Sequence, residues 1–157
     1  MSATTSATVA VAADPDAVYA LITDLDTLAD LAEEVHAMEW VKGSAVAPGA
    51  VFRGRNRNGA RRWTTTCTIT DAEPGRTFAF DVKTGGFIPV ARWCYDITPT
   101  DDGCSVTEST WDRRPGWIKK PAGWTTGVSD REGANAEHIR LTLERLKERA
   151  ESGGAKP

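Results

Sequence analysis

The sequence has few of the residues and patterns that mark special classes of protein. Its three cysteines, Cys67, Cys94 and Cys104, are odd in number and form no Cys-x-x-Cys pair, which favours a reduced protein of the cytoplasm. Its two histidines, His36 and His138, lie far apart with no metal-ligand spacing around them, so we expect no bound metal. No P-loop and no Gly-x-Gly-x-x-Gly pattern is present, and we expect no cofactor.

The chain also lacks a marked excess of positive charge and a long apolar run. The 19 basic residues stand against 22 acidic ones, and the net charge of −3 argues against general nucleic-acid binding. No stretch approaches the ~18 apolar residues of a membrane span. Residues 1–6 show no basic region followed by an apolar stretch, as a secretory signal requires. We therefore expect a cytoplasmic protein with no nucleic-acid partner and no membrane span.

The chain does contain enough apolar residues for one packed domain. Of its 157 residues 40% are hydrophobic, and a domain near this size buries ~70% of the surface that its unfolded chain exposes. We expect one domain over 1–157, with an ordered core at about 7–150 and tails at 1–6 and 151–157. The chain has six tryptophans against four phenylalanines and two tyrosines. Tryptophan suits large cores and apolar ligand pockets alike.

The first 41 residues predict a strand, two short helices and a second strand. Residues 8–12 alternate, with Val9 and Val11 on one face, as in a short strand. Asp14-Pro15 combines a capping residue with a proline suited to the first helical position, which predicts a helix over about 15–24. Leucines at helical spacing over 25–31 predict a second short helix.

The rest of the chain predicts a sheet followed by a long helix. Turn signals recur between 51 and 112, Asn58-Gly59 among them, and the segments between them alternate, which predicts an antiparallel meander of five strands with one apolar face. An apolar stripe over 139–150 predicts a terminal helix, the element large enough to cover that face. We expect an α+β fold in which a curved sheet of about seven strands wraps around this helix and leaves an internal cavity. Residues 113–127 fit a loop, a broken helix or a mobile lid.

Several stretches carry a family resemblance over about 8–150. Asp14–Asp24, Glu73–Phe80 and Gly103–Ser109 resemble the first strand-to-helix junction, the central hairpin and the last strand of the START-like (SRPBCC) helix-grip superfamily, in its polyketide cyclase/dehydrase-like branch. Phe52–Gly59 with Arg61–Cys67 is similar to a subgroup of actinobacterial members, mostly without assigned function. The resemblance implies a helix-grip fold with a pocket for a ligand.

One departure limits what the resemblance implies. Many members carry a Trp-Pro-x-Trp-like motif after the first helix, where this chain has Leu28-Ala29-Asp30-Leu31. Contacts from that region are therefore not carried over, and neither is any catalytic residue.

The alternation of the strands indicates which side chains would line the pocket. The aromatic candidates are Phe52, Trp63, Phe80, Trp93 and Tyr95. Glu108 shares a face with Val106, so that if Val106 points inward, Glu108 does so as well. A carboxylate facing an apolar cavity has a raised pKa and suits proton transfer. The alternative is that Glu108 pairs with an arginine or lies at the exposed end of the strand.

Five further residues are weaker candidates for the site. Trp111 has the opposite parity to Glu108 and would join it only through a bulge. Trp117 and Trp124 lie in a Gly- and Pro-rich segment, where they would either gate an entrance or plug the core. Asn135 and His138 lie on or beside the stripe of the terminal helix and would present polar atoms at the mouth of the cavity. His138 and Glu108 are also the candidates for a catalytic role.

Arginines crowd around the Asn58-Gly59 turn. They are Arg53, Arg55, Arg57, Arg61 and Arg62. They fit either an anion site or a solvated outer face, because the first three alternate away from Phe52.

Three hypotheses of function follow. The first is binding of a small hydrophobic molecule, such as a lipid or an aromatic polyketide, in the internal cavity of a monomer or homodimer. The alternative is a cyclase or dehydratase that acts by positioning and proton transfer. A further alternative is an interaction module that uses the arginine-rich hairpin.

Overall fold

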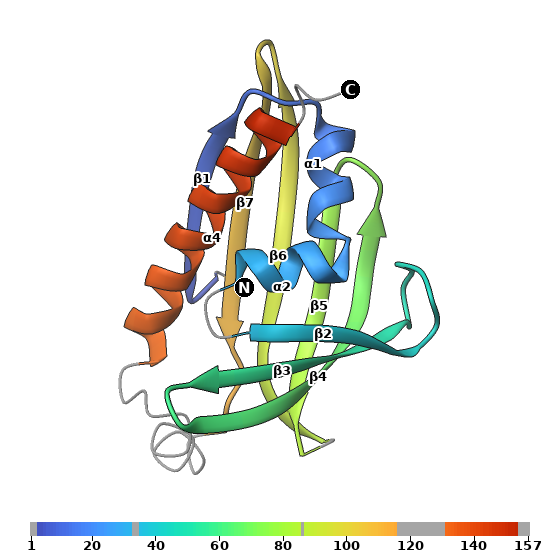
Figure 1. Ribbon diagram of the computed structural model, residues 1–157, viewed down its shortest axis with the longest axis vertical. Helices are drawn as coiled ribbons and strands as arrows, with labels where there is room; N and C mark the ends of the chain where they lie inside the picture. The colour runs from blue at the N-terminus through green and yellow to red at the C-terminus, as the bar shows by residue number, and fades with distance from the viewer. Residues whose placement is uncertain (1–2, 33–34, 86, 116–130, 154–157) are drawn as a thin grey trace.

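A seven-stranded antiparallel sheet organises the protein, in the strand order β1-β7-β6-β5-β4-β3-β2 (Figure 1). The computed structural model describes residues 3–32, 35–85, 87–115 and 131–153. The elements are β1 (Thr5–Val11), α1 (Pro15–Ile22), α2 (Leu25–Leu31), β2 (Val35–Lys42), β3 (Val51–Asn58), β4 (Arg61–Glu73), β5 (Thr77–Thr84), β6 (Ile88–Thr100), β7 (Gly103–Asp112) and α4 (Arg131–Gly153). The predicted α+β helix-grip fold is confirmed.

Capping aspartates begin both short helices. Asp14 accepts a hydrogen bond from the backbone N–H of Asp16, and Pro15 occupies the first position of α1, where no intrahelical partner for an N–H exists. Asp24 does the same for α2 by accepting from the backbone N–H of Thr27. The helix predicted over about 15–24 thus ends at Ile22, because Asp24 already caps the next helix.

The meander between β3 and β7 runs through tight turns. The predicted Asn58-Gly59 turn joins β3 to β4, and Gly59 has φ +64° there. Gly75, with φ +73°, follows β4, and a Cβ at this position would lie 2.5 Å from Oδ1 of Asp16. The positive φ is what favours glycine here, because this backbone conformation strains a residue with a Cβ, whereas the Asp16 carboxylate is the end of a side chain that can turn away.

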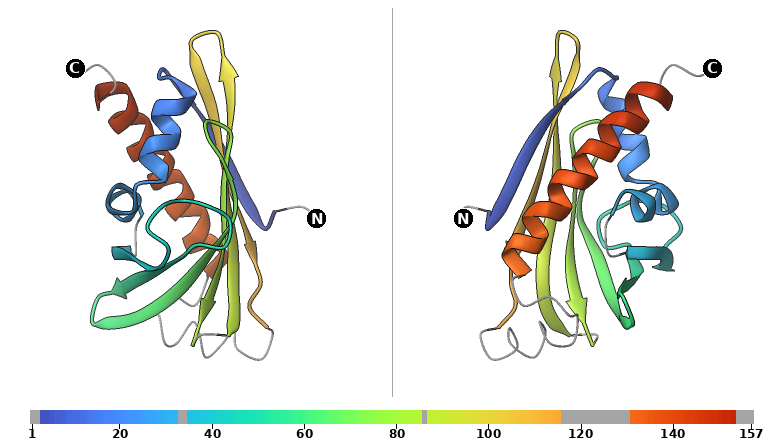
Figure 2. Two further views of the ribbon diagram at one scale, coloured as in Figure 1. Left: turned by 90° about the vertical axis from the view of Figure 1, so that its right-hand side faces the viewer. Right: turned by 60° about the vertical axis from the view of Figure 1, so that its left-hand side comes forward.

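The long helix α4 covers one face of the sheet. Figure 2 shows α4, α1 and α2 on the same side of the curved sheet, and α4 lies chiefly against β1. Its apolar stripe is buried, as predicted, and consists of Ile139, Leu143, Leu146 and Ala150. The end of α2 is tied to this helix, because the backbone carbonyl of Leu31 accepts hydrogen bonds from Thr142 and Arg145. The core therefore lies between the sheet and α4.

Candidate functional site

A buried carboxyl group lies on the face of β7 that α4 covers. Along β7 the residues Cys104, Val106, Glu108 and Thr110 alternate onto this face, and all four are buried. The Glu108 residue is 3% exposed and the Thr110 residue 1%. The placement of Glu108 beside Val106 agrees with the alternation of the sequence, and the alternative of an exposed carboxylate at the end of the strand is excluded.

The environment of Glu108 favours the neutral acid. Burial raises the pKa of Glu108 to about 8, and a side-chain hydrogen bond with Tyr95, its register partner on β6, lowers it in part. Burial, followed by the charge of Glu108, raises the pKa of Tyr95 well above its ordinary value. At pH 7 the folded protein therefore holds mostly a protonated glutamic acid in its interior.

Two polar side-chain atoms on this face of β7 lack hydrogen-bond partners. Oε1 of Glu108 and Oγ1 of Thr110 are buried, and neither forms a hydrogen bond with the residues that the structure describes. A buried polar atom without a partner costs about 1–3 kcal/mol. Thr110 was missed in the sequence, although its parity with Glu108, two residues earlier on the same strand, was a usable signal. We refer to Tyr95, Glu108 and Thr110 as the β7 polar cluster.

Aromatic rings pack next to this cluster in a continuous chain. The ring centroids of Phe52 and Phe80 lie 5.2 Å apart, those of Phe78 and Phe80 5.4 Å, and those of Phe78 and Tyr95 6.4 Å. Trp40 meets Phe52 edge-on at 6.2 Å. Phe52 and Phe80 are thus members of the packed core, whereas the hydroxyl end of Tyr95 reaches the polar cluster.

Two tryptophans on the same face are only half-buried. Trp93 is the register partner of Thr110 on β7 and of Phe80 on β5, so its indole lies on the covered face next to the polar cluster. Trp63 lies further along the sheet opposite Asn56, which is buried and donates hydrogen bonds to the hydroxyl of Thr65 and the carbonyl of Trp63. Asn56 is a second buried polar residue that the sequence analysis missed, although its parity with Phe52 placed it inside.

Trp111 lies on the opposite face of the sheet. The pairing of β6 with β7 runs without a bulge from Ala91 opposite Asp112 to Thr100 opposite Gly103, so Trp111 and Glu108 point to opposite sides. The Arg92 guanidinium carbon lies 5.8 Å from the centroid of the Trp111 ring. The expectation that Trp111 joins Glu108 in a pocket is corrected on this ground.

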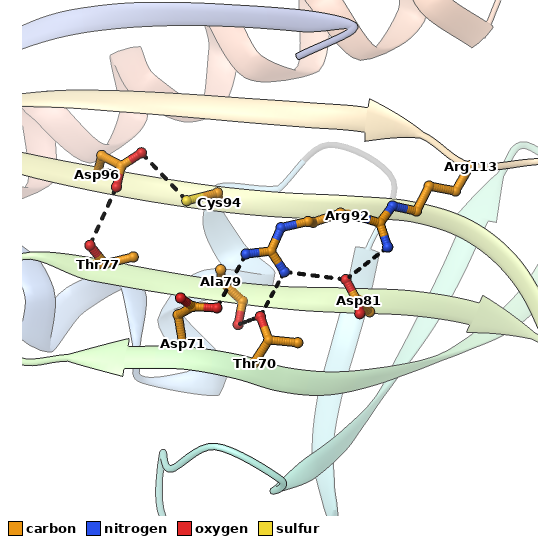
Figure 3. A network of polar contacts seen from close by, with 9 residues as sticks. All are labelled: Thr70, Asp71, Thr77, Ala79, Asp81, Arg92, Cys94, Asp96 and Arg113. Carbon is orange, nitrogen blue, oxygen red and sulfur yellow. Dashed lines mark hydrogen bonds and ion pairs between the residues drawn. The ribbon is translucent and has the colours of Figure 1, made fainter. Parts of the chain in front are cut away.

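The outer face around Arg92 carries a network of polar contacts (Figure 3). Arg92 donates hydrogen bonds to Thr70, Asp71 and Asp81, and Arg113 pairs with Asp81 at 3.7 Å. These contacts join β4, β5 and β6 side by side. The network is a cross-strand brace on the face that α4 does not cover.

The remaining candidates lie on α4 or outside the described residues. Asn135 is 8% exposed and precedes Ile139 by one turn on the buried stripe, while His138 is half-buried. Trp117 and Trp124, together with most of the segment 113–127, fall outside the described residues. The roles of Asn135 and His138 at a ligand site stay predictions.

The arginine-rich hairpin has two distinct parts. Arg53 and Arg55 face outward and pair with Glu39 of β2 at 3.5 and 2.8 Å, which agrees with an outer-face role for these two. Arg57 and Arg62 are exposed and lie directly opposite each other, next to Arg61 at the turn. Among the described residues no carboxylate pairs with these three arginines.

Other kinds of chemistry find little support in the described part of the chain. Burial raises the pKa of Cys67 to about 12, so its thiol is not an activated nucleophile. Within the described ranges no group of three or more His, Cys, Asp or Glu side chains is placed to hold a metal ion. Over the same residues, no helix has both the length and the apolar character needed to cross a bilayer.

The curved sheet and its covering helix define a helix-grip domain, with a buried polar cluster between them. Comparison with known protein families places the chain in one of them. The sequence model of the family "Polyketide cyclase / dehydrase and lipid transport" matches residues 2–151. The chain belongs to this family, as its resemblance predicted. No curated protein matches the sequence.

Solved structures support the same fold. The protein NE0264 from Nitrosomonas europaea is 15% identical with a TM-score of 0.74, covering 99% of this chain and 100% of that one. The Polyketide_cyc-like protein Cgl2372 from Corynebacterium glutamicum is 24% identical with a TM-score of 0.62, covering 93% and 90%. The di-domain ARO/CYC StfQ from the steffimycin biosynthetic pathway is 15% identical with a TM-score of 0.75; the match covers 97% of this chain and 51% of StfQ, so the chain spans about half of that protein.

Proposed function

We propose that the protein binds a small hydrophobic molecule between the sheet and α4, next to the β7 polar cluster. The observation that carries the proposal is the pair of buried, unpartnered oxygens on Glu108 and Thr110. Folding would not leave two such atoms uncompensated at a cost of about 1–3 kcal/mol each unless another group meets them. A ligand with a polar end meets them, and its apolar body removes further surface from water at ~25 cal/mol per Å².

The surroundings of the cluster fit a flat apolar ligand. Trp93 lies beside Thr110 in the register and keeps part of its surface exposed, as a ring able to stack on a ligand would. The family description, which combines cyclases, dehydrases and lipid transport, agrees with an interior that receives an organic molecule. The di-domain ARO/CYC StfQ, which is similar in fold, belongs to the steffimycin biosynthetic pathway.

The tryptophan indole N–H signals provide the test. In a heteronuclear NMR titration with aromatic polyketides, fatty acids and aromatic hydrocarbons, the Trp93 indole signal should shift on binding. The Trp111 signal serves as the internal control, since that ring lies on the outer face. Trp93→Phe and Trp111→Phe assign the two signals. If no compound in the panel moves Trp93 selectively, ligand binding at this site is refuted.

A cyclase or dehydratase activity is the second candidate, and the state of Glu108 is the observation that favours it. A carboxyl with a pKa of about 8 can give up or accept a proton near neutral pH. If the protein is such an enzyme, Glu108→Gln should abolish turnover and leave binding of the substrate nearly unchanged. Unchanged turnover in this variant would remove Glu108 from the mechanism.

A further inference from the structure

The unpartnered atoms on β7 form one polar patch with a defined direction. Glu108 and Thr110 are separated by one residue, so both side chains leave β7 on the face that α4 covers, with their Cα atoms about 7 Å apart along the strand. The backbone carbonyl of Thr110 accepts a hydrogen bond from the N–H of Thr4, which fixes the strand at this point. The backbone that carries both side chains is therefore held in place, and both oxygens are buried in the interior.

Each of these groups can donate a hydrogen bond. The threonine hydroxyl carries one O–H, and a neutral carboxylic acid carries another. Burial keeps the proton on Glu108 at neutral pH, since its pKa is raised to about 8. Tyr95, hydrogen-bonded to the same carboxyl, is the one ionisable side chain among the described residues that acts on the pKa of Glu108. A carboxylic acid held neutral in this way is an effective donor to a carbonyl oxygen.

The geometry points to Glu108 and Thr110 as a pair of hydrogen-bond donors that select a ligand bearing a carbonyl oxygen, such as an aromatic ketone, over the corresponding hydrocarbon or amine. This inference rests on the proposed function and deepens it by naming the class of ligand. A hydrocarbon would leave both oxygens unpaired, and an ammonium group would require an ionised carboxylate in a buried place.

Three compounds with one ring skeleton test the inference. Fluorene, 9-fluorenone and 9-aminofluorene differ only in carrying a methylene, a carbonyl or an amino group at the same carbon. Their dissociation constants are measured by calorimetry on the full chain at pH 6.5, with NMR of the Trp93 indole to locate binding. We expect fluorenone to bind about tenfold more tightly than fluorene. Fluorene has no acceptor, so its binding would leave the two buried hydrogen-bond donors unpaired.

Matched variants assign the preference to the two side chains. Thr110→Val removes a hydroxyl at constant shape and should reduce the preference for fluorenone several-fold, whereas Thr110→Ser should keep it. Glu108→Gln keeps an N–H donor and should retain the preference, and Glu108→Leu should lose it. Trp111→Phe, on the outer face, is the control and should behave like the wild type.

The outcomes separate the inference from the proposed function. Equal binding of fluorene and fluorenone near Trp93 would overturn the inference and leave ligand binding intact. Tightest binding of 9-aminofluorene would overturn it in favour of an anionic Glu108. If none of the three compounds perturbs Trp93, while the wider panel also fails, the proposed function falls and the inference falls with it. If Glu108→Leu does not fold, the Thr110→Val and Thr110→Ser pair decides.

Discussion

The buried glutamic acid should make the stability of the fold depend on pH. In an unfolded chain the pKa of Glu108 is about 4.5, and burial raises it to about 8 in the folded state. Between these values the folded state binds more protons than the unfolded state, so the free energy of unfolding falls as pH rises. This difference in pKa lowers the free energy of unfolding by about 5 kcal/mol at a pH above 8, compared with a pH below 4.5.

Glu108→Gln removes this dependence while keeping the size and polarity of the side chain. The glutamine variant should be more stable than the wild type at pH 7.5, and its advantage should grow by about 2–3 kcal/mol between pH 5.5 and 7.5. Urea unfolding followed by tryptophan fluorescence measures both proteins across this range.

A control variant separates this effect from the general loss of a negative charge. Glu148 is exposed on α4, so Glu148→Gln should follow the wild-type pH profile. A difference in stability between Glu108→Gln and the wild type that stays constant from pH 5.5 to 7.5 would refute the reasoning. In that case Glu108 would not hold its proton in the folded state.

Three further predictions concern stability. Leu146→Ala removes a fully buried side chain of α4 and should lower the free energy of unfolding by about 2–5 kcal/mol in urea. Gly75→Ala should lower the melting temperature, because its φ of +73° is a backbone conformation that strains a residue with a Cβ; unchanged melting would contradict this account of the hairpin. Arg62→Glu turns the like-charge pair of Arg57 and Arg62 into a pair of opposite charges. It should raise the free energy of unfolding by up to about 1 kcal/mol, and high salt should weaken this effect.

Local signals in the sequence sufficed for most of the fold. Asp14-Pro15, the Asn58-Gly59 turn and the stripe ending at Ala150 each act within a few residues, and the structure follows them. The inward direction of Glu108 followed from its parity with Val106. Such features depend on caps and turns within a few residues, or on backbone periodicity, and a single sequence displays both.

The site required information that one sequence does not hold. The register between β6 and β7 decides that Tyr95 pairs with Glu108. Because that register runs without a bulge, Trp111 lies on the opposite face from both residues. The packing of Phe52 against Phe80 depends on contact across β3, β4 and β5, which the periodicity of any one strand leaves undetermined. The parity of Thr110 with Glu108 placed it on the inner face, but the lack of a hydrogen-bond partner for its hydroxyl depends on tertiary packing, which the sequence does not display.

The arrangement of β1 and α4 has a consequence for how the protein forms during synthesis. β1 is completed before any other strand, yet its antiparallel partner, β7, follows more than ninety residues later, and the helix that rests on β1 comes later still. Lys147 of α4 even reaches back to the backbone carbonyl of Ala10. Until α4 has left the ribosome, the apolar side of the meander lacks the cover of this helix, so the nascent chain should engage chaperones and should complete this fold only once α4 has emerged.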